Sequence, residues 1–286
     1  SLMLAAGFSS CTGDLDVPPK DPNQDTPEKM FAADPRGTMD RLLAECYQGL
    51  ATAGNKGSDQ SILGFGDAGA GTFTRTIFNL EELTTDHFSW LQFNDGGYYE
   101  LVTMAFAPDN EIMYAAYSRI YGEIAICNEV IRTIQQYRSY LPDGDQAAAD
   151  DAIRQAKILR SLAYFYAISD FGSAGYVDET TEAGTAPVQY SRADLYNKVV
   201  STLEEVSAEY GDSYTAPAYG YVGKEAADAL LARFYLNAGV FTGTPAYDKC
   251  WNICQKIIAH HQGAGFDNSG LSDSYKALFG ANNKEY

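Results

Sequence analysis

Residues 113–134 read MYAAYSRIYGEIAICNEVIRTI, and this stretch decides the fold class. Its bulky apolar side chains recur at spacings that alternate between four and three residues, which is the period of one face of an α-helix. Asn110 lies ahead of the stripe and can cap a helix, and the helix breaker Pro142 follows it. We therefore predict one long helix that is buried along one face. The stripe consists of Met113, Tyr117, Ile120, Ile124, Cys127, Ile131 and Ile134.

The same spacing recurs along most of the remaining sequence and predicts further helices. Ser191 followed by Asp194 is close to a capping box, which marks the start of one of them. Small alanines stand where neighbouring helices would have to approach closely. The expected helices span about 38–51, 150–169, 191–210, 224–238 and 246–260.

Successive helices of this kind would pair as hairpins. We therefore predict an all-α fold, a degenerate solenoid of tetratricopeptide-like hairpins, because no regular repeat emerges. Long loops are expected over about 52–110, 170–190 and 211–223, and loops of this length are usually functional or mobile. Trp251 lies on the apolar stripe of the last predicted helix, so we expect it in the core.

The cysteines after the N-terminal region are expected to be buried free thiols. Cys46 and Cys127 fall on apolar stripes, where cysteine packs as a small hydrophobic residue. Cys250 and Cys254 stand four residues apart on one predicted helix. A zinc site there would need two more ligands, and only two adjacent histidines are near, so we expect no metal.

Residues 1–11 resemble the end of a bacterial lipoprotein signal. They form an apolar stretch that ends in small residues and then Cys11, which would carry the acyl chains of a lipid anchor. The alternative is a buried N-terminal strand with a free cysteine. Residues 12–35 are rich in Pro, Asp, Asn and Gln, which predicts an extended tether.

The charge of the chain disfavours some partners. The 286 residues include 38 Asp and Glu against 20 Lys and Arg, for a net charge of −18. A field of this sign repels phosphates, so nucleic-acid binding is not expected. No apolar run has the roughly 20 residues that a membrane-spanning helix needs.

Four helical segments carry the pattern of a known family. In this order, and with Cys11 ahead of them, they resemble the SusD/RagB family over most of residues 11–260. A departure follows Phe171-Gly172, where Ser-Ala-Gly replaces the family's Gly-x-Pro, so we expect this loop to differ. The segments are 118–131 (SRIYGEIAICNEVI), 156–166 (AKILRSLAYFY), 191–196 (SRADLY) and 223–236 (GKEAADALLARFYL).

The resemblance implies a lipid-anchored protein on the surface of the Bacteroidetes outer membrane. Such proteins lie as a lid on a SusC-like, TonB-dependent transporter barrel and deliver oligosaccharides to it. In some members, which are RagB-like, the ligand is a peptide. The resemblance also implies that residues 36–286 form the α-helical domain of this family, truncated at its C-terminal end because the family's chains are longer.

The candidate ligand site lies in the first long loop. Phe88, Trp90 and Phe93 stand beside Asn94 and Asp95. Sugars stack an apolar ring face on aromatic side chains while amide and carboxylate groups bind the hydroxyls. In the resembled family the matching stretch carries aromatics that stack on glucans. The alternative is that Trp90 and Phe93 pack as a small core beneath the loop.

The sequence lacks the motifs of the common enzyme classes, so we expect no catalysis and no cofactor. It has no G-x-S-x-G, and its histidines have no nucleophile beside them. Residues 64–69 match G-x-G-x-x-G, but no helix start follows, so a loop is expected. Besides the glycan-binding lipoprotein, three alternatives remain: a peptide-binding lid, a scaffold that binds only the transporter, and a glycoside hydrolase.

Overall fold

The computed structural model describes residues 25–52, 71–92, 94–182, 184–212, 214–215, 218, 220–263 and 274–280. Residues 1–11, which the sequence predicts as a signal remnant ending in Cys11, and residues 64–69 lie outside this part of the chain. The helices are α1 (Pro27–Ala33), α2 (Pro35–Ala51), α3 (Phe73–Glu82), α4 (Tyr98–Val102), α5 (Glu111–Gln136), α6 (Gln146–Tyr166), α7 (Arg192–Glu209), α8 (Lys224–Thr242) and α9 (Tyr247–Gly263). Short 3-10 helices span Arg138–Tyr140, Asp143–Asp145 and Tyr275–Phe279, and a π-helical turn spans Ala167–Phe171. Strands β1 (Ala174–Tyr176) and β2 (Val188–Tyr190) form an antiparallel pair.

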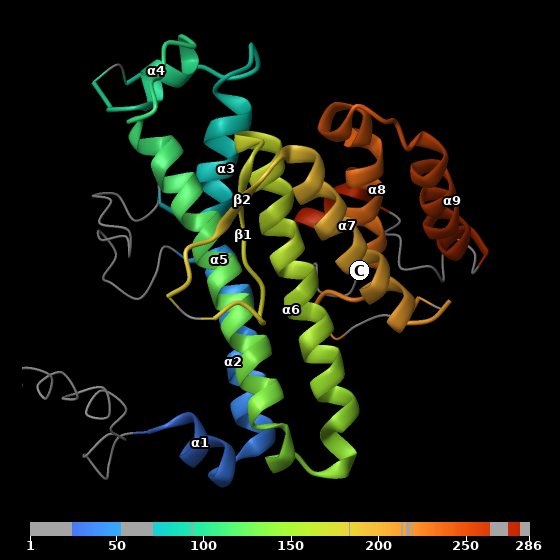
Figure 1. Ribbon diagram of the computed structural model, residues 1–286. Coiled ribbons are helices and arrows are strands. Elements are labelled where there is room, and N and C mark those ends of the chain that lie inside the picture. Colours follow the sequence, from blue (N-terminus) through green and yellow to red (C-terminus); the bar gives the residue numbers. More distant parts are fainter. Residues whose placement is uncertain are drawn as a thin grey trace, which may run out of the picture.

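The mainly α-helical fold is confirmed, and consecutive helices pack side by side as expected of hairpins. α5 packs against α6, α7 against α8 and α8 against α9 (Figure 1). The long α5–α6 hairpin lies in the middle, with α2 and α3 along α5, α1 packed on α2, and α7 and α8 beyond α6. The strand pair lies in front of the α5–α6 hairpin in the view of Figure 1.

The α5 stripe is buried for most of its length. Ile120, Ile124, Ile131 and Ile134 are fully buried, and they contribute to both of the large core clusters. Ala116 on α5 and small residues on α6 allow the close approach of the two helices. At the start of α5 the stripe is not fully buried: the Tyr117 side chain, which the spacing predicts to be buried, is 42% exposed. The other small buried residues in this contact are Ala152, Ala156 and Ala163.

Two predicted loop segments turn out to contain helices. The loop expected over 52–110 includes α3 and α4, and the tether expected over 12–35 includes α1. α3 carries a short helical stripe, Phe73, Ile77 and Leu80, at spacings of four and three residues, which the loop prediction overlooked. α1 is short, but Thr26 caps it and its Phe31 is fully buried and stacks on Tyr137.

The prediction for Trp251 is wrong, and that for the cysteines is right in part. Trp251 is 66% exposed, because α9 is the last helix of the stack and packs mainly on α8. Cys46 and Cys127 are free and fully buried, as expected. Cys250 and Cys254 are free but only half-buried, since they lie on the same outer helix.

The loop expected over 170–190 is held down by the hydroxyls of two tyrosines, the half-buried Tyr121 and the buried Tyr164. Tyr121 of α5 donates to the carbonyl of Gly175 at 2.8 Å. Tyr164 of α6 donates to the Val177 carbonyl at 2.7 Å and accepts from the Val177 amide at 2.8 Å. The strand pair is therefore fixed to the central hairpin, and much of this predicted loop is ordered.

A buried ion pair completes this attachment. Arg160 of α6 is 3% exposed, donates to Asn128 Oδ1 at 2.6 Å and forms an ion pair with Glu179 of the loop. The ion pair holds the pKa of Glu179 below its ordinary value against the effect of burial. Removing one partner would leave a buried charge uncompensated, which is strongly destabilising.

Glu123 of α5 is a buried acid without a charged partner. It is 2% exposed, and burial raises its pKa to about 8. Its Oε1 accepts from the Cys127 thiol at 3.3 Å, whereas Oε2 has no partner among the described residues. A Cβ added at Gly49 of α2 would overlap Oε2, so the glycine permits the close approach of α2 to α5.

We predict that Glu123 makes the protein less stable as the pH rises. The folded pKa of about 8 lies above the ordinary value of 4.5, so between these values the folded state binds one proton more than the unfolded state. The free energy of unfolding then falls by about 1.4 kcal/mol per pH unit. Urea unfolding of the Glu123→Gln variant should lack this slope. Glu129→Gln, at an exposed position of the same helix, is the control, and an unchanged slope in Glu123→Gln would contradict the assignment.

Candidate functional site

The candidate site lies at one end of the molecule, where α3, the following loop, α4 and the start of α5 meet (upper left in Figure 1). A small core of its own supports this region. Leu83, Tyr98, Leu101 and Ile112 are buried together, and Trp90 packs against them. The loop is therefore a folded unit that is attached to the first turn of α5.

Asn110 provides that attachment. Its Oδ1 accepts from the Ile112 and Met113 amides and caps α5, as the sequence predicts. Its Nδ2 donates to the Gly97 carbonyl at 2.9 Å and to Glu100 Oε2 at 2.8 Å. Asn110 is 3% exposed, so a single buried amide joins the cap of α5 to the turn before α4.

Gly97 is required in this turn for two reasons. Its φ of 80° lies in the left-handed region that favours glycine. A Cβ at this position would also approach Ile112 Cγ1 to 3.0 Å. Glycine at position 97 therefore permits the tight turn that joins the loop with Trp90 and Asp95 to α4.

Trp90 is half-buried and held in place from two directions. Its ring stacks on Tyr98 with a centroid distance of 4.1 Å and an interplanar angle of 7°. Its Nε1–H donates to Asp95 Oδ2 at 3.1 Å. Tyr98 therefore covers one face of the indole, as the packing alternative expects. Asp95 uses one of its carboxylate oxygens to orient the ring.

The other predicted site residues are not gathered around Trp90. Phe88 is 48% exposed and packs edge-on against Phe78 of α3 at 5.1 Å. Asn94 is exposed in the turn next to Asp95. Phe93 lies outside the described residues. The structure therefore brings Trp90 and Asp95 together and leaves Phe88 on a neighbouring part of the same surface.

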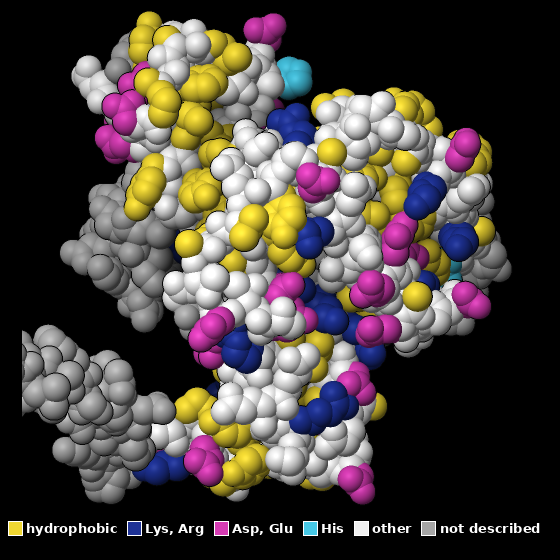
Figure 2. Space-filling view, viewed as in Figure 1, with side chains coloured by type: hydrophobic (Ala, Val, Ile, Leu, Met, Phe, Trp, Pro, Cys, Tyr) yellow, Lys and Arg dark blue, Asp and Glu magenta, His cyan; other side chains and the backbone are white. Residues whose placement is uncertain are grey.

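Several exposed aromatic residues at this end were missed by the sequence reasoning. They come from α4, the loop after it and the first turns of α5, and Figure 2 shows hydrophobic side chains gathered there. For Tyr99 and Tyr114 the general excess of tyrosine, 21 residues, was the only signal, whereas Tyr117 was expected in the buried stripe of α5. These residues, with their exposed fractions, are Tyr99 (44%), Phe106 (40%), Tyr114 (63%) and Tyr117 (42%).

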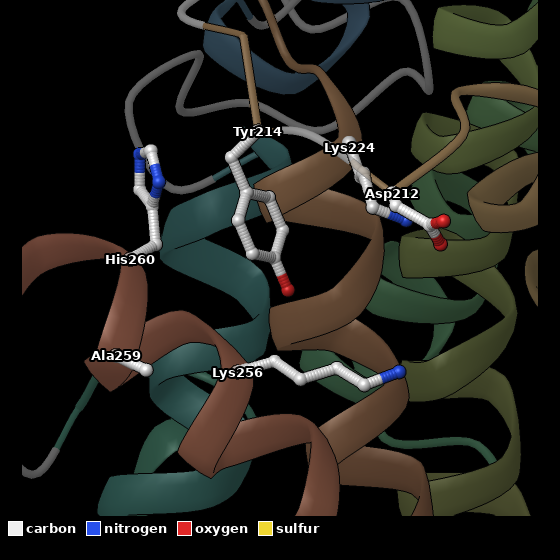
Figure 3. A pocket seen from close by; sticks show the side chains of 6 residues that line it. All are labelled: Asp212, Tyr214, Lys224, Lys256, Ala259 and His260. Carbon is white, nitrogen blue, oxygen red and sulfur yellow. The ribbon is translucent and has the colours of Figure 1, made fainter. Parts of the chain in front are cut away.

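A second hollow lies between the end of α7 and the end of α9, with a volume of about 630 Å³ (Figure 3). Tyr214 donates to Asp228 Oδ2 at 2.7 Å, and Lys224 donates to the Ser207 carbonyl at 2.9 Å. Burial raises the pKa of Tyr214, and its hydrogen bond to Asp228 raises it further, so its hydroxyl stays protonated. The hollow is lined by Asp212, Tyr214, Lys224, Lys256, Ala259 and His260.

Neither the hollow nor the rest of the described chain offers a site for metal chemistry. Among the residues with described positions, no group of three or more His, Cys, Asp or Glu side chains could hold a metal ion. Within the same residues, no helix is both long and apolar enough to cross a membrane.

Comparison with known proteins finds a similar sequence and similar folds. No protein-family model matches the sequence. The starch-binding protein SusD of Bacteroides thetaiotaomicron is 29% identical over 289 residues, which cover 99% of this chain and 47% of that protein. The chain thus spans about half the length of this curated relative.

Solved structures show the same fold. Surface glycan-binding protein A of Bacteroides thetaiotaomicron, in complex with laminarihexaose, matches with a TM-score of 0.61 and 18% identity over 87% of this chain and 47% of that one. A laminarin-binding SusD-like protein matches with a TM-score of 0.58 and 18% identity over 77% and 42% of the two chains. The chain is thus similar in sequence to SusD and shares its fold with SusD-like proteins.

We predict that Asn110→Asp separates the two roles of this residue. Aspartate can still cap α5, but it cannot donate to Gly97, and its charge would face Glu100. In a Trp251→Phe background, where Trp90 is the sole tryptophan, iodide should quench Trp90 more strongly after the substitution, while helical circular dichroism is unchanged. Asp109→Asn, at an exposed neighbouring position, is the control. Equal quenching in both variants would show that Asn110 does not hold the loop.

Proposed function

We propose that the protein binds oligosaccharides at the surface formed by the Trp90 loop, α4 and the first turns of α5. The observation that carries this proposal is the Trp90 ring, which Tyr98 and Asp95 hold in a fixed orientation at the end of the molecule where α4 and the start of α5 carry exposed aromatics. A rigid ring loses little entropy on binding, so it suits stacking on the apolar face of a sugar.

The ligand class is supported by the names of the relatives. SusD is described as starch-binding, and two solved structures of this fold are described as binding laminarin or laminarihexaose. Tyr99, Phe106 and Tyr114 would extend the stacking surface beyond one sugar ring, and Asn94 would offer an amide to the hydroxyls. These positions favour a chain of several sugar units over a monosaccharide.

The protein would bind its ligand without altering it. We propose that the bound oligosaccharide passes unchanged to a SusC-like, TonB-dependent transporter of the outer membrane. The aromatic surface also leaves a peptide ligand as the alternative, as in RagB-like members.

A lipid anchor on Cys11 would keep the protein at the outer-membrane surface. Cells that express the precursor with its signal should incorporate radiolabelled palmitate into the protein, and Cys11→Ala should abolish the label. Cys46→Ala, at a buried position in α2, is the control and should keep the label. Incorporation that persists in Cys11→Ala would place the anchor elsewhere, and no incorporation into the parent protein would exclude it.

We predict that Trp90→Ala weakens oligosaccharide binding at least tenfold, because loss of a stacking aromatic ring costs about 1.4 kcal/mol or more. Isothermal titration calorimetry with maltooligosaccharides, laminarioligosaccharides and a peptide mixture measures the effect. Trp90→Tyr should retain most of the affinity, since it keeps a ring in the same place. Tyr140→Ala, an exposed tyrosine beyond the C-terminal end of α5, is the matched control.

The same titrations decide between the alternatives. An unchanged Kd in Trp90→Ala would remove Trp90 from the site. Binding of peptides alone would favour the peptide-capturing lid, and binding of neither class would favour the scaffold. Release of reducing ends from a bound oligosaccharide would contradict binding without catalysis.

A further inference from the structure

Two cysteines from different helices, Cys46 of α2 and Cys127 of α5, lie together in the core. Both are 0% exposed, both belong to the same core cluster, and both are free thiols in the structure. The Cys46 thiol lies within hydrogen-bonding reach of Cys127, and burial and then this neighbour raise the pKa of the Cys127 thiol. The two residues are far apart in the sequence, so the packing of α2 against α5 is what brings their sulfurs together.

The register of the two helices explains this contact. One turn after Cys46, Gly49 lies so close to α5 that an added Cβ would overlap the carboxylate of Glu123. Glu123 lies one turn before Cys127. A step forward along α2 therefore matches a step backward along α5, and the two helices run antiparallel in Figure 1. Because Gly49 lets the backbones approach, the next facing pair of side chains, the two cysteines, is also brought close.

A carboxyl group that can accept a proton lies beside the pair. The Cys127 thiol donates to Glu123 Oε1 at 3.3 Å, and Oε2 has no partner among the described residues. A thiol must lose its proton before its sulfur can attack a disulfide. Burial raises the pKa of Glu123 to about 8, which is close to the ordinary value of a thiol, so proton transfer from Cys127 to Glu123 is nearly balanced in free energy.

We propose that Cys46 and Cys127 form a disulfide that joins α2 to α5 when the chain folds in the presence of a small disulfide oxidant. The reaction is thiol–disulfide exchange. The Cys46 sulfur first attacks the oxidant, forms a mixed disulfide and releases one oxidant thiol. Cys127 then gives its proton to Glu123, its sulfur attacks the Cys46 sulfur, and the second oxidant thiolate leaves and takes up that proton. Two cysteine thiols are thereby oxidised, and one disulfide is reduced to two thiols.

The cross-link would close the chain segment that contains α3, the Trp90 loop and α4. Closing a long segment restricts the unfolded chain and so stabilises the fold. Because both sulfurs are fully buried, a reductant would reach the bond only after the protein unfolds. The inference does not depend on the proposed function, although an exported protein would meet such an oxidant.

The test uses the 286-residue chain with Cys11→Ser, Cys250→Ser and Cys254→Ser, which leaves Cys46 and Cys127 as its only cysteines. The reduced protein is unfolded in urea and refolded with a mixture of reduced and oxidised glutathione. The intact mass should fall by about 2 Da, because the new bond replaces two S–H hydrogens. N-ethylmaleimide added in urea should then find no free thiol.

Two further measurements report on the native geometry. The melting temperature of the oxidised protein should exceed that of the same protein refolded with reductant by at least about 5 °C. A phosphine reductant should cleave the bond in urea but not in the native protein. Cys46→Ala and Cys127→Ala in the same background are the controls, and each should show no loss of mass.

The unsubstituted chain provides a second route if the triple serine variant does not fold. After the same refolding, peptide mapping without reductant should recover Cys46 and Cys127 in one disulfide-linked pair of peptides. Two alkylated thiols at these positions, or a cross-link that joins separate chains, would overturn the inference. A bond that forms but lowers the melting temperature would also overturn it, because the native packing would then not accommodate the bridge.

Discussion

The close packing of α5 against α6 is the constraint on which the rest of the structure depends. Alanines at the contact bring the two backbones together, and the isoleucines of α5 then reach both large core clusters. The same hairpin positions the strand pair through Tyr121, Tyr164 and Arg160, and it positions the candidate site through the first turn of α5. Helices on either side of it are thus oriented by one shared surface, which is how helical solenoids build their shape.

The sequence was a good guide to long helices and a poor guide to short ones. The stripe of α5 and the Ser191 cap of α7 were predictable, because long periodic segments and capping residues carry strong local signals. α1 and α3 were missed, because with seven and ten residues they offer only two or three turns of periodic spacing. Trp251 was misjudged for another reason: periodicity shows which face of a helix is apolar but not whether a neighbour covers it.

In the candidate site, too, contacts between residues close in sequence could be predicted, whereas contacts between different elements could not. Trp90 and Asp95 are close in sequence, so their pairing could be suspected, and the structure joins them by a hydrogen bond. Tyr98 beneath Trp90 and the exposed Tyr114 of α5 belong to different elements, and only the fold brings them to one end of the molecule. The second role of Asn110 was likewise invisible, since its capping role accounts for its position in the sequence.

The hydrogen bonds of Asn110 to both the loop and the first turn of α5 determine how ligand binding to the loop can be detected. Because one buried amide ties the loop to the cap of α5, ordering the loop and stabilising the central hairpin are coupled events. A compound that binds only the ordered loop therefore raises the melting temperature of the whole domain by mass action. Thermal-shift screening of a carbohydrate library could then rank candidate nutrients without any label on the protein.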